Sequence, residues 1–397
     1  MEARLTTAQA AEALGVRPST VYAYVSRGVL GRVSEVVEGR RVSFFDRAEV
    51  LGLAAERARS RAGVVSTLIE SDVTSLDPRG RLLLRGHDIG DLAGQGFEQA
   101  AALVWQDDSV PWPPVHPDWR RAAEQVAVAG AADPRDRLVL ALTLAGAADE
   151  HREDLGREHV LTVARGAIQL APAVVGVAGG DAPNRPTRGG VAPGAPVAEQ
   201  PGRVAGELWR ALAGRTAGPA EFAAIETALV VLMDHELAAS TLAVRIAAST
   251  RADPWSCLLA GLAVLRGSRH GGAGIRAAVL LREWMERGGL VGPPAAGFGH
   301  AVYEQTDPRA ELLLERVAAL SPEGAAAVES LSTEVLRRHG AWPNVDLALA
   351  ALTVAGGLDD RAPAVIFAVA RMVGWTAHML EEQPHGLRYR PRAVAGG

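Results

Sequence analysis

Apolar residues recur at spacings of three and four along most of the chain beyond residue 62, as they do in amphipathic helices. The clearest examples are FEQAAALVW, PRDRLVLALTLAGAA, EFAAIETALVVLMDHELAASTLAVRIAAST and IRAAVLLREWMERG. Several of these segments are apolar on nearly every side, which indicates helices buried at the centre of a large protein. The pattern therefore predicts a mainly α-helical fold from residue 62 to residue 397.

The first 58 residues show a different pattern and predict a separate small unit. The stretch TTAQAAEALGV predicts a short helix with Thr6 or Thr7 as its N-cap and Gly15 at its end. A second helix over RPSTVYAYVSRGVL, a hairpin over residues 33–45 and a third helix opened by Asp46 follow. Two short helices joined closely and followed by a β-ribbon are typical of a winged helix-turn-helix domain.

A third kind of segment covers residues 172–203, which are rich in proline and glycine. This composition favours a loop over a packed element. We therefore expect this stretch to interrupt the helical region without joining its core.

The composition narrows the chemistry that the chain can perform. Its 397 residues are enough for two or three domains with a sizeable core, and its formal net charge of -5 does not favour nucleic acid as a partner. The sequence contains no lysine, so all 41 basic residues are arginines, which excludes Schiff-base and P-loop chemistry. Anions must then be bound by arginine, which can hold a carboxylate through two hydrogen bonds.

Cysteine content and hydropathy bear on the location of the protein. Cys257 is the only cysteine, so an internal disulfide is impossible, and burial as a small apolar residue explains it best. No apolar run reaches the roughly 20 residues that a membrane span needs. The N-terminal residues do not have the pattern of a signal peptide. We therefore expect a cytoplasmic protein.

Three histidines stand in distinctive contexts: His235 in MDHELAAST, His270 in SRHGGAGIR and His300 in GFGHAVYEQTDPR. No pair has the His-x3-His or Cys-x2-Cys spacing of a metal site, so we reject zinc. Nine residues after His300, Arg309 follows an Asp-Pro pair at the start of a predicted helix. An imidazole in a glycine-rich turn and a guanidinium before a helix suggest either packing or joint binding of a small anionic substrate.

His270 and Asp346 each have a chemical context of their own. His270 precedes two glycines and a helix, where the positive end of the helix dipole favours a neutral imidazole that can donate to an enolate. Asp346 lies at the entrance of an apolar helix, in AWPNVDLALAAL, where desolvation raises the pKa of a carboxyl toward that of a general base. Taken singly, the two residues could equally be a helix cap and an N-cap.

Together, these stretches resemble the citrate synthase family. The resemblance also covers residues 71–105 and the motifs DHELAASTLAVR, RHGGA, PNVD, FAVARMVGWTAHMLEE and RYRPRA, in family order from about residue 65 to the C-terminus. It implies a two-domain helical fold over residues 62–397, with a small mobile subdomain over about residues 271–353, a homodimer and no permanently bound cofactor. The reaction implied is the condensation of acetyl-CoA with oxaloacetate and water to citrate and CoA. Synthesis of 2-methylcitrate from propionyl-CoA is the alternative.

The resemblance also implies a role for each matching residue. Asp346 would remove a methyl proton from acetyl-CoA, His270 would stabilise the resulting enol, and His300 would polarise the oxaloacetate carbonyl. The remaining assignments are His235, Arg309, Arg371 and Arg390 for binding oxaloacetate, with Arg390 reaching the active site of the partner subunit, and Gly297 and Gly299 for binding coenzyme A.

Four positions depart from the family pattern. Ala238 stands where an asparagine is common, Gly274 and Ile275 where an Asn-Glu or Asn-Gln pair is common, and Glu304 where a basic residue is common. These changes bear on the choice of substrate and on the affinity for coenzyme A more than on the catalytic residues.

The N-terminal unit resembles the winged helix-turn-helix of the excisionase and MerR type. Arg17, Arg27, Arg40 and Arg41 are its candidates for DNA contact. Residues 1–58 carry eight arginines and seven acidic residues, so the net charge of the unit is only about +1. Three alternatives stay open: the unit binds DNA, it makes protein contacts, or the chain is a DNA-binding regulator whose synthase-like domain senses a metabolite.

Overall fold

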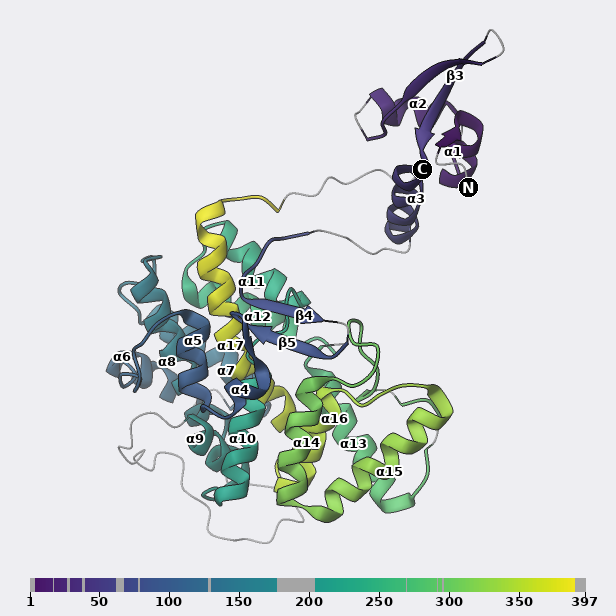
Figure 1. Ribbon diagram of the computed structural model, residues 1–397. Coiled ribbons are helices and arrows are strands. Elements are labelled where there is room, and N and C mark those ends of the chain that lie inside the picture. Colours follow the sequence, from purple (N-terminus) through teal and green to yellow (C-terminus); the bar gives the residue numbers. More distant parts are fainter. Residues whose placement is uncertain are drawn as a thin grey trace. The chain divides into compact units, whose positions relative to one another are not determined.

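The computed structural model describes residues 4–16, 18–26, 29–37, 40–61, 68–77, 79–127, 130–176, 204–268, 270–290, 292–294 and 296–389. Figure 1 shows a mainly helical chain, so the predicted fold class is confirmed. The chain forms two compact units, residues 1–70 and 71–397, and each has its own hydrophobic core.

The N-terminal unit combines three helices with a three-stranded antiparallel sheet of order β1-β3-β2. Thr6 begins α1 through a capping box with Gln9, and Gly15 ends it in the left-handed conformation. The helices and the hairpin lie where the sequence predicts them, whereas β1 was not predicted. The elements are β1 Arg4–Thr6, α1 Thr7–Leu14, α2 Pro18–Ser26, β2 Val33–Val37, β3 Arg40–Asp46 and α3 Arg47–Arg61.

The second unit begins with a small antiparallel sheet that the sequence did not predict, and continues as helices. The strands are β4 Thr74–Asp77, β5 Arg81–Leu84 and β6 His87–Asp88. The helices are α4 Ile89–Ala93, α5 Phe97–Trp105, α6 Pro117–Glu124, α7 Pro134–Ala147, α8 Arg157–Val175, α9 Val204–Ala213, α10 Pro219–Val231, α11 Ala239–Ser249, α12 Pro254–Leu265, α13 Gly272–Arg287, α14 Pro308–Leu320, α15 Pro322–His339, α16 Val345–Gly356 and α17 Ala362–Glu382.

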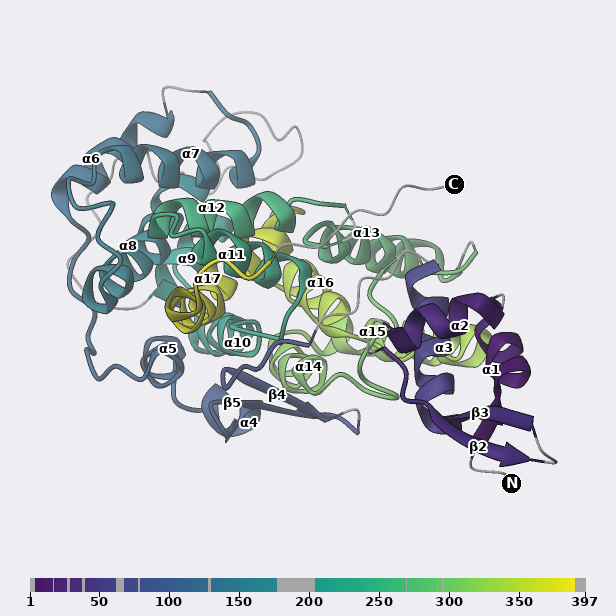
Figure 2. The same ribbon diagram turned by 90° about the horizontal axis from the view of Figure 1, so that it is seen from above.

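Helix α17 is the centre of this unit. It packs against α5, α8, α10, α11 and α12, and Figure 2 views it nearly end-on among several of them. The packing is close: at Gly261 on α12, a Cβ atom would lie 2.8 Å from the ring of the fully buried Trp375. Larger residues at Gly261 would therefore force the two helices apart.

The length of α17 corrects one expectation from the sequence. This helix is long and apolar enough to cross a membrane, by length and composition alone. Its most apolar window is 94% buried inside the unit, however, as in the core helix of a globular protein. Its apolar character therefore serves the core of the helical unit.

Helices α13 to α16 pack on one another and lie together in Figures 1 and 2. They run from Gly272 to Gly356 and so largely coincide with residues 271–353, for which the resemblance implies a small mobile subdomain. Helix α16 touches α13, α14 and α15, and α14 also packs against α10. This group therefore meets the rest of the unit along α10 and α17, where the candidate site lies.

The boundary of the proline- and glycine-rich segment also needs correction. Residues 172–175 are not a loop, because α8 continues through Pro172 to Val175. Pro172, Val174 and Val175 are buried, whereas Ala173 is exposed. Burial of the apolar face outweighs the helix-breaking tendency of proline here. Residues 177–203 lie outside the described residues.

Candidate active site

Three loops, the first turns of α14 and α16, and the middle of α17 bring six of the predicted residues together. His235 follows α10, His270 precedes α13 and His300 precedes α14, whereas Arg309 and Asp346 are the second residues of α14 and α16. The rings of His235 and His300 are 4.9 Å apart between centroids. On α17, Phe367 contacts the ring of His270 and the guanidinium of Arg371, at 5.8 and 4.5 Å. Segments that are far apart in the sequence thus converge on one place.

His300 is fixed by its own turn. Its Nδ1 accepts hydrogen bonds from the backbone N–H groups of Val302 and Tyr303, at 3.0 and 3.4 Å. Because Nδ1 is an acceptor, the proton of the neutral ring must be on Nε2. Burial, and then the charge of Arg309, lower the pKa of His300, so the neutral form is favoured.

This tautomer places two donors face to face. Nε2 of His300 lies 3.4 Å from Nη2 of Arg309, and a guanidinium can only donate. Two N–H groups cannot satisfy each other, so an acceptor between or beside them is required. A carbonyl or carboxylate oxygen of a ligand would supply it. The geometry therefore favours the second explanation of this stretch, joint binding of an anion, over packing alone.

The carboxylate of Asp307 holds Arg309 in place. It accepts from Nε and Nη2 of Arg309, at 2.9 and 2.8 Å, and it also N-caps α14. The same carboxylate accepts from the backbone N–H of Val345 at 3.0 Å, which ties α14 to α16. Burial alone would raise the pKa of Asp307, but Arg309 and these hydrogen bonds outweigh burial and lower it.

Gly297 and Gly299 fix the approach of His300 to α16. Their φ angles are 88° and 75°, a region that residues with a Cβ rarely adopt. The carbonyl of Gly297 accepts from the backbone N–H of Asn344, and the carbonyl of Gly299 accepts from the side-chain amide of Asn344. The two glycines thus have a conformational reason to be present, and their role in binding coenzyme A stays a prediction.

Asp346 is the second residue of α16 and not its N-cap, which is Asn344. Its side chain is partly buried, and burial raises its pKa to about 6. Among the described residues, no hydrogen bond or ion pair engages this carboxylate. A carboxylate that is desolvated but unpaired is suited to accept a proton from a ligand.

His270 is held as a neutral imidazole. Its Nε2 lies 2.8 Å from Oγ of the buried Ser240. Burial, and then the charge of Arg371, lower the pKa of His270 to about 4. The predicted direction is therefore right, and burial and a neighbouring cation are causes of it.

His235 and Arg371 complete the polar lining. The Nε2 of His235 lies 2.9 Å from the hydroxyl of Tyr303, and both residues are buried. Arg371 donates from Nε to the carbonyl of Leu232, whereas its buried Nη2 has no partner among the described residues. Burial lowers the pKa of Arg371 to about 10, so the side chain stays cationic at neutral pH. A buried cation with an unused N–H indicates an anionic ligand.

The sequence did not single out Ser240, Tyr303, Asp307, Asn344 or Phe367. Each of the five lies within five residues of a predicted site residue, so proximity in sequence was the available signal. Ala238 is the N-cap of α11 and makes no side-chain hydrogen bond there.

The other predicted residues include several that the structure does not describe. Arg17, Arg27 and Arg390 lie outside the described residues, and the side chains of Arg40 and Arg41 on β3 are not described either. Ile275 lies in α13, and Glu304 is exposed in the turn before α14. Their predicted roles stay predictions. Among the described residues, no group of three or more His, Cys, Asp or Glu side chains could hold a metal ion.

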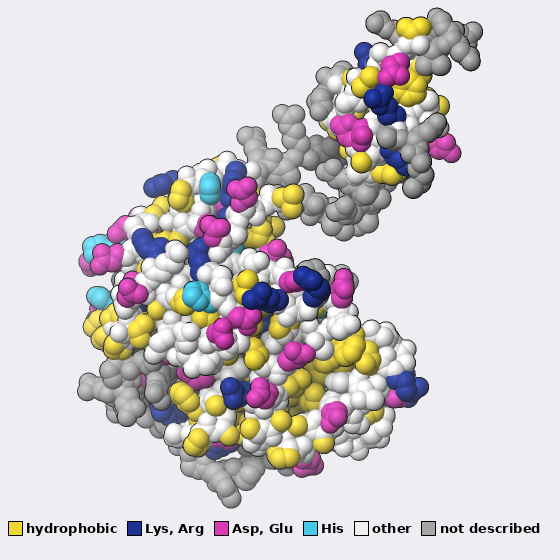
Figure 3. Space-filling model, in the orientation of Figure 1, with side chains coloured by type: hydrophobic (Ala, Val, Ile, Leu, Met, Phe, Trp, Pro, Cys, Tyr) yellow, Lys and Arg dark blue, Asp and Glu magenta, His cyan; other side chains and the backbone are white. Residues whose placement is uncertain are grey.

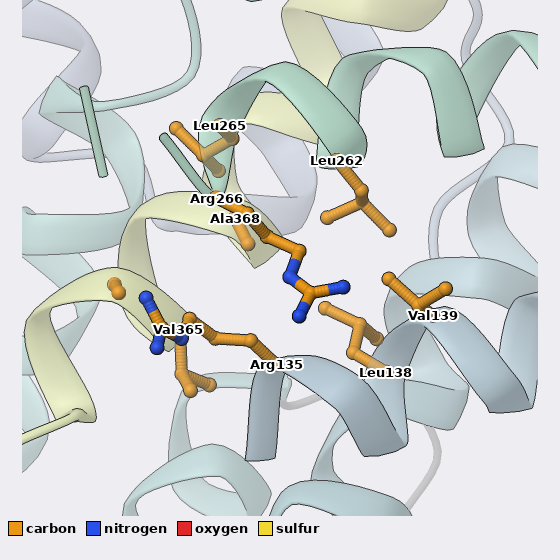
Figure 4. A pocket seen from close by; sticks show the side chains of 9 residues that line it. Arg135, Leu138, Val139, Leu262, Leu265, Arg266, Val365 and Ala368 are labelled. Carbon is orange, nitrogen blue, oxygen red and sulfur yellow. The ribbon is translucent and has the colours of Figure 1, made fainter. Parts of the chain in front are cut away.

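A pocket elsewhere in the unit does not compete with this site. It lies between α7, α12 and α17 and is lined by apolar side chains together with Arg135 and Arg266 (Figure 4). Both guanidinium groups already have carboxylate partners, Asp133 at 2.6 Å and Asp136 at 2.5 Å.

On the face seen in Figure 3, arginine and acidic side chains of the helical unit are interspersed. That face therefore offers no extended cationic surface for a polyanion.

The chain is similar to known proteins in sequence and in structure. The sequence profile described as "Citrate synthase, C-terminal domain" matches residues 63–392. The citrate synthase of Thermoplasma acidophilum is 32% identical over 206 residues, which are 46% of this chain and 54% of that protein. Citrate synthase 2 of Bacillus subtilis is 36% identical over 196 residues, which are 46% of this chain and 53% of that protein. These alignments thus span about half of the length of either relative.

Longer matches exist at lower identity. The 2-methylcitrate synthase of Mycobacterium tuberculosis H37Rv is 26% identical over 371 residues, covering 86% of this chain and 92% of that protein. The ternary complex of Thermoplasma acidophilum citrate synthase with carboxymethyl coenzyme A and oxaloacetate has a TM-score of 0.65 at 23% identity, covering 85% and 96%. Citrate synthase from Pyrobaculum aerophilum has a TM-score of 0.66 at 23% identity, covering 85% and 92%. The structures at this identity show a shared fold.

The raised pKa of Asp346 makes stability depend on pH. Since folding favours its protonated form, the stabilising contribution is complete below about pH 4 and is lost as pH rises through 6. Asp346→Asn keeps a neutral group at every pH. We expect the variant to gain about 1–3 kcal/mol in free energy of unfolding relative to the unchanged protein between pH 4 and pH 7.5. Urea unfolding at several pH values measures this gain.

The low-pH end is the internal control for this experiment, because both proteins then carry a neutral side chain at position 346. A difference in unfolding free energy that stays constant from pH 4 to pH 7.5 would contradict the raised pKa.

Proposed function

Because the chain belongs to the citrate synthase family, we propose that it condenses acetyl-CoA with oxaloacetate and water to give citrate and CoA. One observation carries this proposal. The donors of His300 and Arg309 converge at 3.4 Å, and the charge of Arg309 also acts on the unpaired carboxylate of Asp346. A site that can donate hydrogen bonds to the oxygens of an oxo-acid thus lies close to a base, the carboxylate of Asp346, whose pKa is about 6.

The chemistry assigns a step to each group. Asp346 takes a proton from the methyl group of the thioester, which is a poor carbon acid and needs a positioned base. His270, neutral and held by Ser240, donates a hydrogen bond to the enol oxygen that forms. The enol carbon attacks the ketone of oxaloacetate, whose oxygen is polarised by Nε2–H of His300. Water then cleaves the thioester of the citryl intermediate and releases the CoA thiol.

The binding of oxaloacetate follows from the arginines. Arg309 and Arg371 are both buried and cationic, so they can compensate the two carboxylates of a bound dianion. His235, hydrogen-bonded to Tyr303, is kept neutral because burial and both arginines lower its pKa. A neutral imidazole adds a hydrogen bond without further charge. These contacts support a small dicarboxylate as the first substrate.

A related reaction is the second candidate. The 2-methylcitrate synthase of Mycobacterium tuberculosis matches most of both chains, which favours propionyl-CoA as an alternative acyl donor. The positions that depart from the family pattern include Gly274, next to Asp346 on the neighbouring helix. A Cβ at Gly274 would lie 2.8 Å from the side chain of Pro363, so packing also explains this glycine. The acyl chain length is therefore decided by the assay below.

Release of the CoA thiol with oxaloacetate tests the reaction for both acyl donors. We expect turnover with acetyl-CoA to exceed turnover with propionyl-CoA. Asp346→Asn should lower kcat by about 100- to 10,000-fold, because it removes the base, while the affinity for oxaloacetate stays within about twofold. Asp118→Asn, a change in the first turn of α6, is the matched control and should leave kcat unchanged.

Absence of thiol release from the unchanged protein with any 2-oxo acid would contradict the proposed reaction. Full turnover of Asp346→Asn would contradict the role of Asp346 alone. A higher kcat/KM for propionyl-CoA would select the second candidate.

We also propose that the protein works as a homodimer and that Arg390 binds the substrate in the site of the partner subunit. The family resemblance supports this assembly, and helical proteins with many apolar faces have surface to bury between copies. Each site would then need residues of both chains, with Asp346 from one and Arg390 from the other.

Subunit mixing tests this arrangement. Asp346→Asn and Arg390→Ala homodimers should each be nearly inactive, and a mixture should recover activity, since one of the two sites in a heterodimer is then intact. Recovery of up to half of the unchanged activity per heterodimer is expected. No recovery after proven subunit exchange would show that Arg390 acts within its own chain or has no catalytic part.

For the N-terminal unit we propose DNA binding. The two short helices α1 and α2, followed by the β2–β3 hairpin, support a winged helix-turn-helix with α2 as the recognition helix. A role in protein contacts is the alternative, because the unit has a net charge of only about +1. A regulator that senses a metabolite without catalysis has no need for the base Asp346, so we favour an enzyme.

A gel shift with DNA from upstream of the coding sequence tests the proposal. We expect salt-dependent binding that Arg17→Ala or Arg27→Ala weakens, lowering the salt slope by about 1 each. Arg4→Ala is the control within the same unit, since Arg4 is already paired with Glu35. No specific shift at low salt would favour protein contacts, and a shift that depends on oxaloacetate in the absence of thiol release would favour the sensor.

A further inference from the structure

A second cluster of charged side chains lies behind the site and takes no part in the proposed chemistry. It consists of Asp234, Arg245, His378, Glu381 and Glu382, and we call it the buried charge cluster. The side chains of Asp234, Arg245, His378 and Glu382 are 0% exposed. Ionised groups without solvent contact are costly unless each is paired and oriented. The cluster therefore needs a reason beyond stability.

The hydrogen bonds of the cluster fix the protonation of His378. Nη1 of Arg245 lies 2.8 Å from Nδ1 of His378, and since a guanidinium only donates, Nδ1 must be unprotonated. The proton of the neutral ring is then on Nε2, which donates to Oδ2 of Asp234 at 3.1 Å. His378 thus accepts a hydrogen bond from the cation of Arg245 at Nδ1 and donates one to the carboxylate of Asp234 from Nε2.

Asp234 connects the cluster to the site. It directly precedes His235, and its Oδ2 also accepts from the backbone N–H of Glu236, which has a φ of 58°. On α17, Gly374 leaves room for Asp234, because a Cβ there would overlap the carboxylate, and the charge of Asp234 acts on Arg371. The carboxylate thus holds the loop that carries His235 and partly balances Arg371.

The two ends of the helical unit attach to the same cluster. On the C-terminal side, Arg388 donates to both oxygens of Glu382, at 2.7 and 2.8 Å, and Tyr389 donates to Glu382 at 2.7 Å. On the N-terminal side, the hydroxyl of Thr74 donates to Asp234 at 2.5 Å, and the backbone N–H of Asp72 donates to Glu381. The first strand of the unit and its last described residues therefore meet in one hydrogen-bonded network.

We propose that Asp234 and His378 are positioning residues for the dicarboxylate site, and that they transmit the docking of the Arg388–Tyr389 segment on Glu382 to the loop of His235. The path runs from Arg388 through Glu382, Arg245 and His378 to Asp234, with every step a hydrogen bond. The expected effect of this path on substrate binding rests on the proposed function, because the substrate is taken to be oxaloacetate.

Three variants test the path from both ends. His378→Gln retains a donor and an acceptor in a different geometry, Arg388→Ala removes the outer ion pair, and the third combines the two. Arg135→Ala is the matched control, because Arg135 is similarly exposed, pairs with Asp133 through two nitrogens and lies away from the site. Tyr389→Phe, on the exposed side of the cluster, replaces His378→Gln if that variant does not fold.

The first readout is independent of activity. In the ligand-free protein with ¹⁵N-labelled histidine, we expect His378 to show a proton on Nε2 and none on Nδ1. Arg388→Ala should shift the ring signals of His235, whereas Arg135→Ala should leave them in place. The proposal would be overturned, whatever reaction the protein catalyses, by either of two results. One is a proton on Nδ1 of His378, and the other is that Arg388→Ala leaves the ring signals of His235 unchanged.

The second readout is the split between KM and kcat. His378→Gln and Arg388→Ala should each raise KM for oxaloacetate about 5- to 20-fold with kcat within about threefold, since they loosen binding groups and leave the base untouched. The double variant should be no worse than the poorer single variant, because residues of one network are not additive. Unchanged KM values, or effects that multiply, would overturn the transmission while leaving the proposed reaction intact.

Discussion

The buried pair of Asp307 and Arg309 is the interaction on which the candidate site depends most. The carboxylate of Asp307 caps α14 and accepts hydrogen bonds from two nitrogens of the guanidinium. It also accepts a hydrogen bond from the backbone N–H of Val345 at the start of α16. It therefore sets the position of Arg309 against His300 and, through α16, the position of Asp346. Replacing Asp307 by an uncharged residue would lower the stability of the protein by more than the loss of one ion pair, because the buried guanidinium of Arg309 would be left uncompensated.

Within the described part of the chain, the site keeps several polar groups whose hydrogen-bonding capacity no protein group fully satisfies. The N–H groups of His300 and Arg309 face each other, Nη2 of Arg371 is unpaired within the described part of the chain, and Asp346 is desolvated. Each of these features costs stability in the empty protein. An anionic ligand that supplies oxygen acceptors and a transferable proton would relieve the cost, so the same features that destabilise the fold favour binding.

Helix α17 serves both the site and the cluster behind it. Arg371, Gly374 and His378 follow one another at spacings of three and four, so they lie on one face of the helix. That face meets Leu232 and Asp234 of the loop before α11, through the guanidinium, the missing side chain of the glycine and the imidazole. A mainly apolar helix thus places Arg371, Gly374 and His378 against the same loop.

The sequence by itself determined the helical class, the caps of α1 and the local frames of His235, His270, His300 and Asp346. These properties depend on hydrophobic periodicity and on neighbours within a few residues. It did not reveal that His270 is neutral through burial and Arg371, or that His378 joins Asp234 to Arg245. Those facts depend on side chains more than 100 residues apart, as between Asp234 and His378 at a separation of 144. Protonation and partner choice follow from burial and from the distance between such groups, and only the tertiary structure decides these.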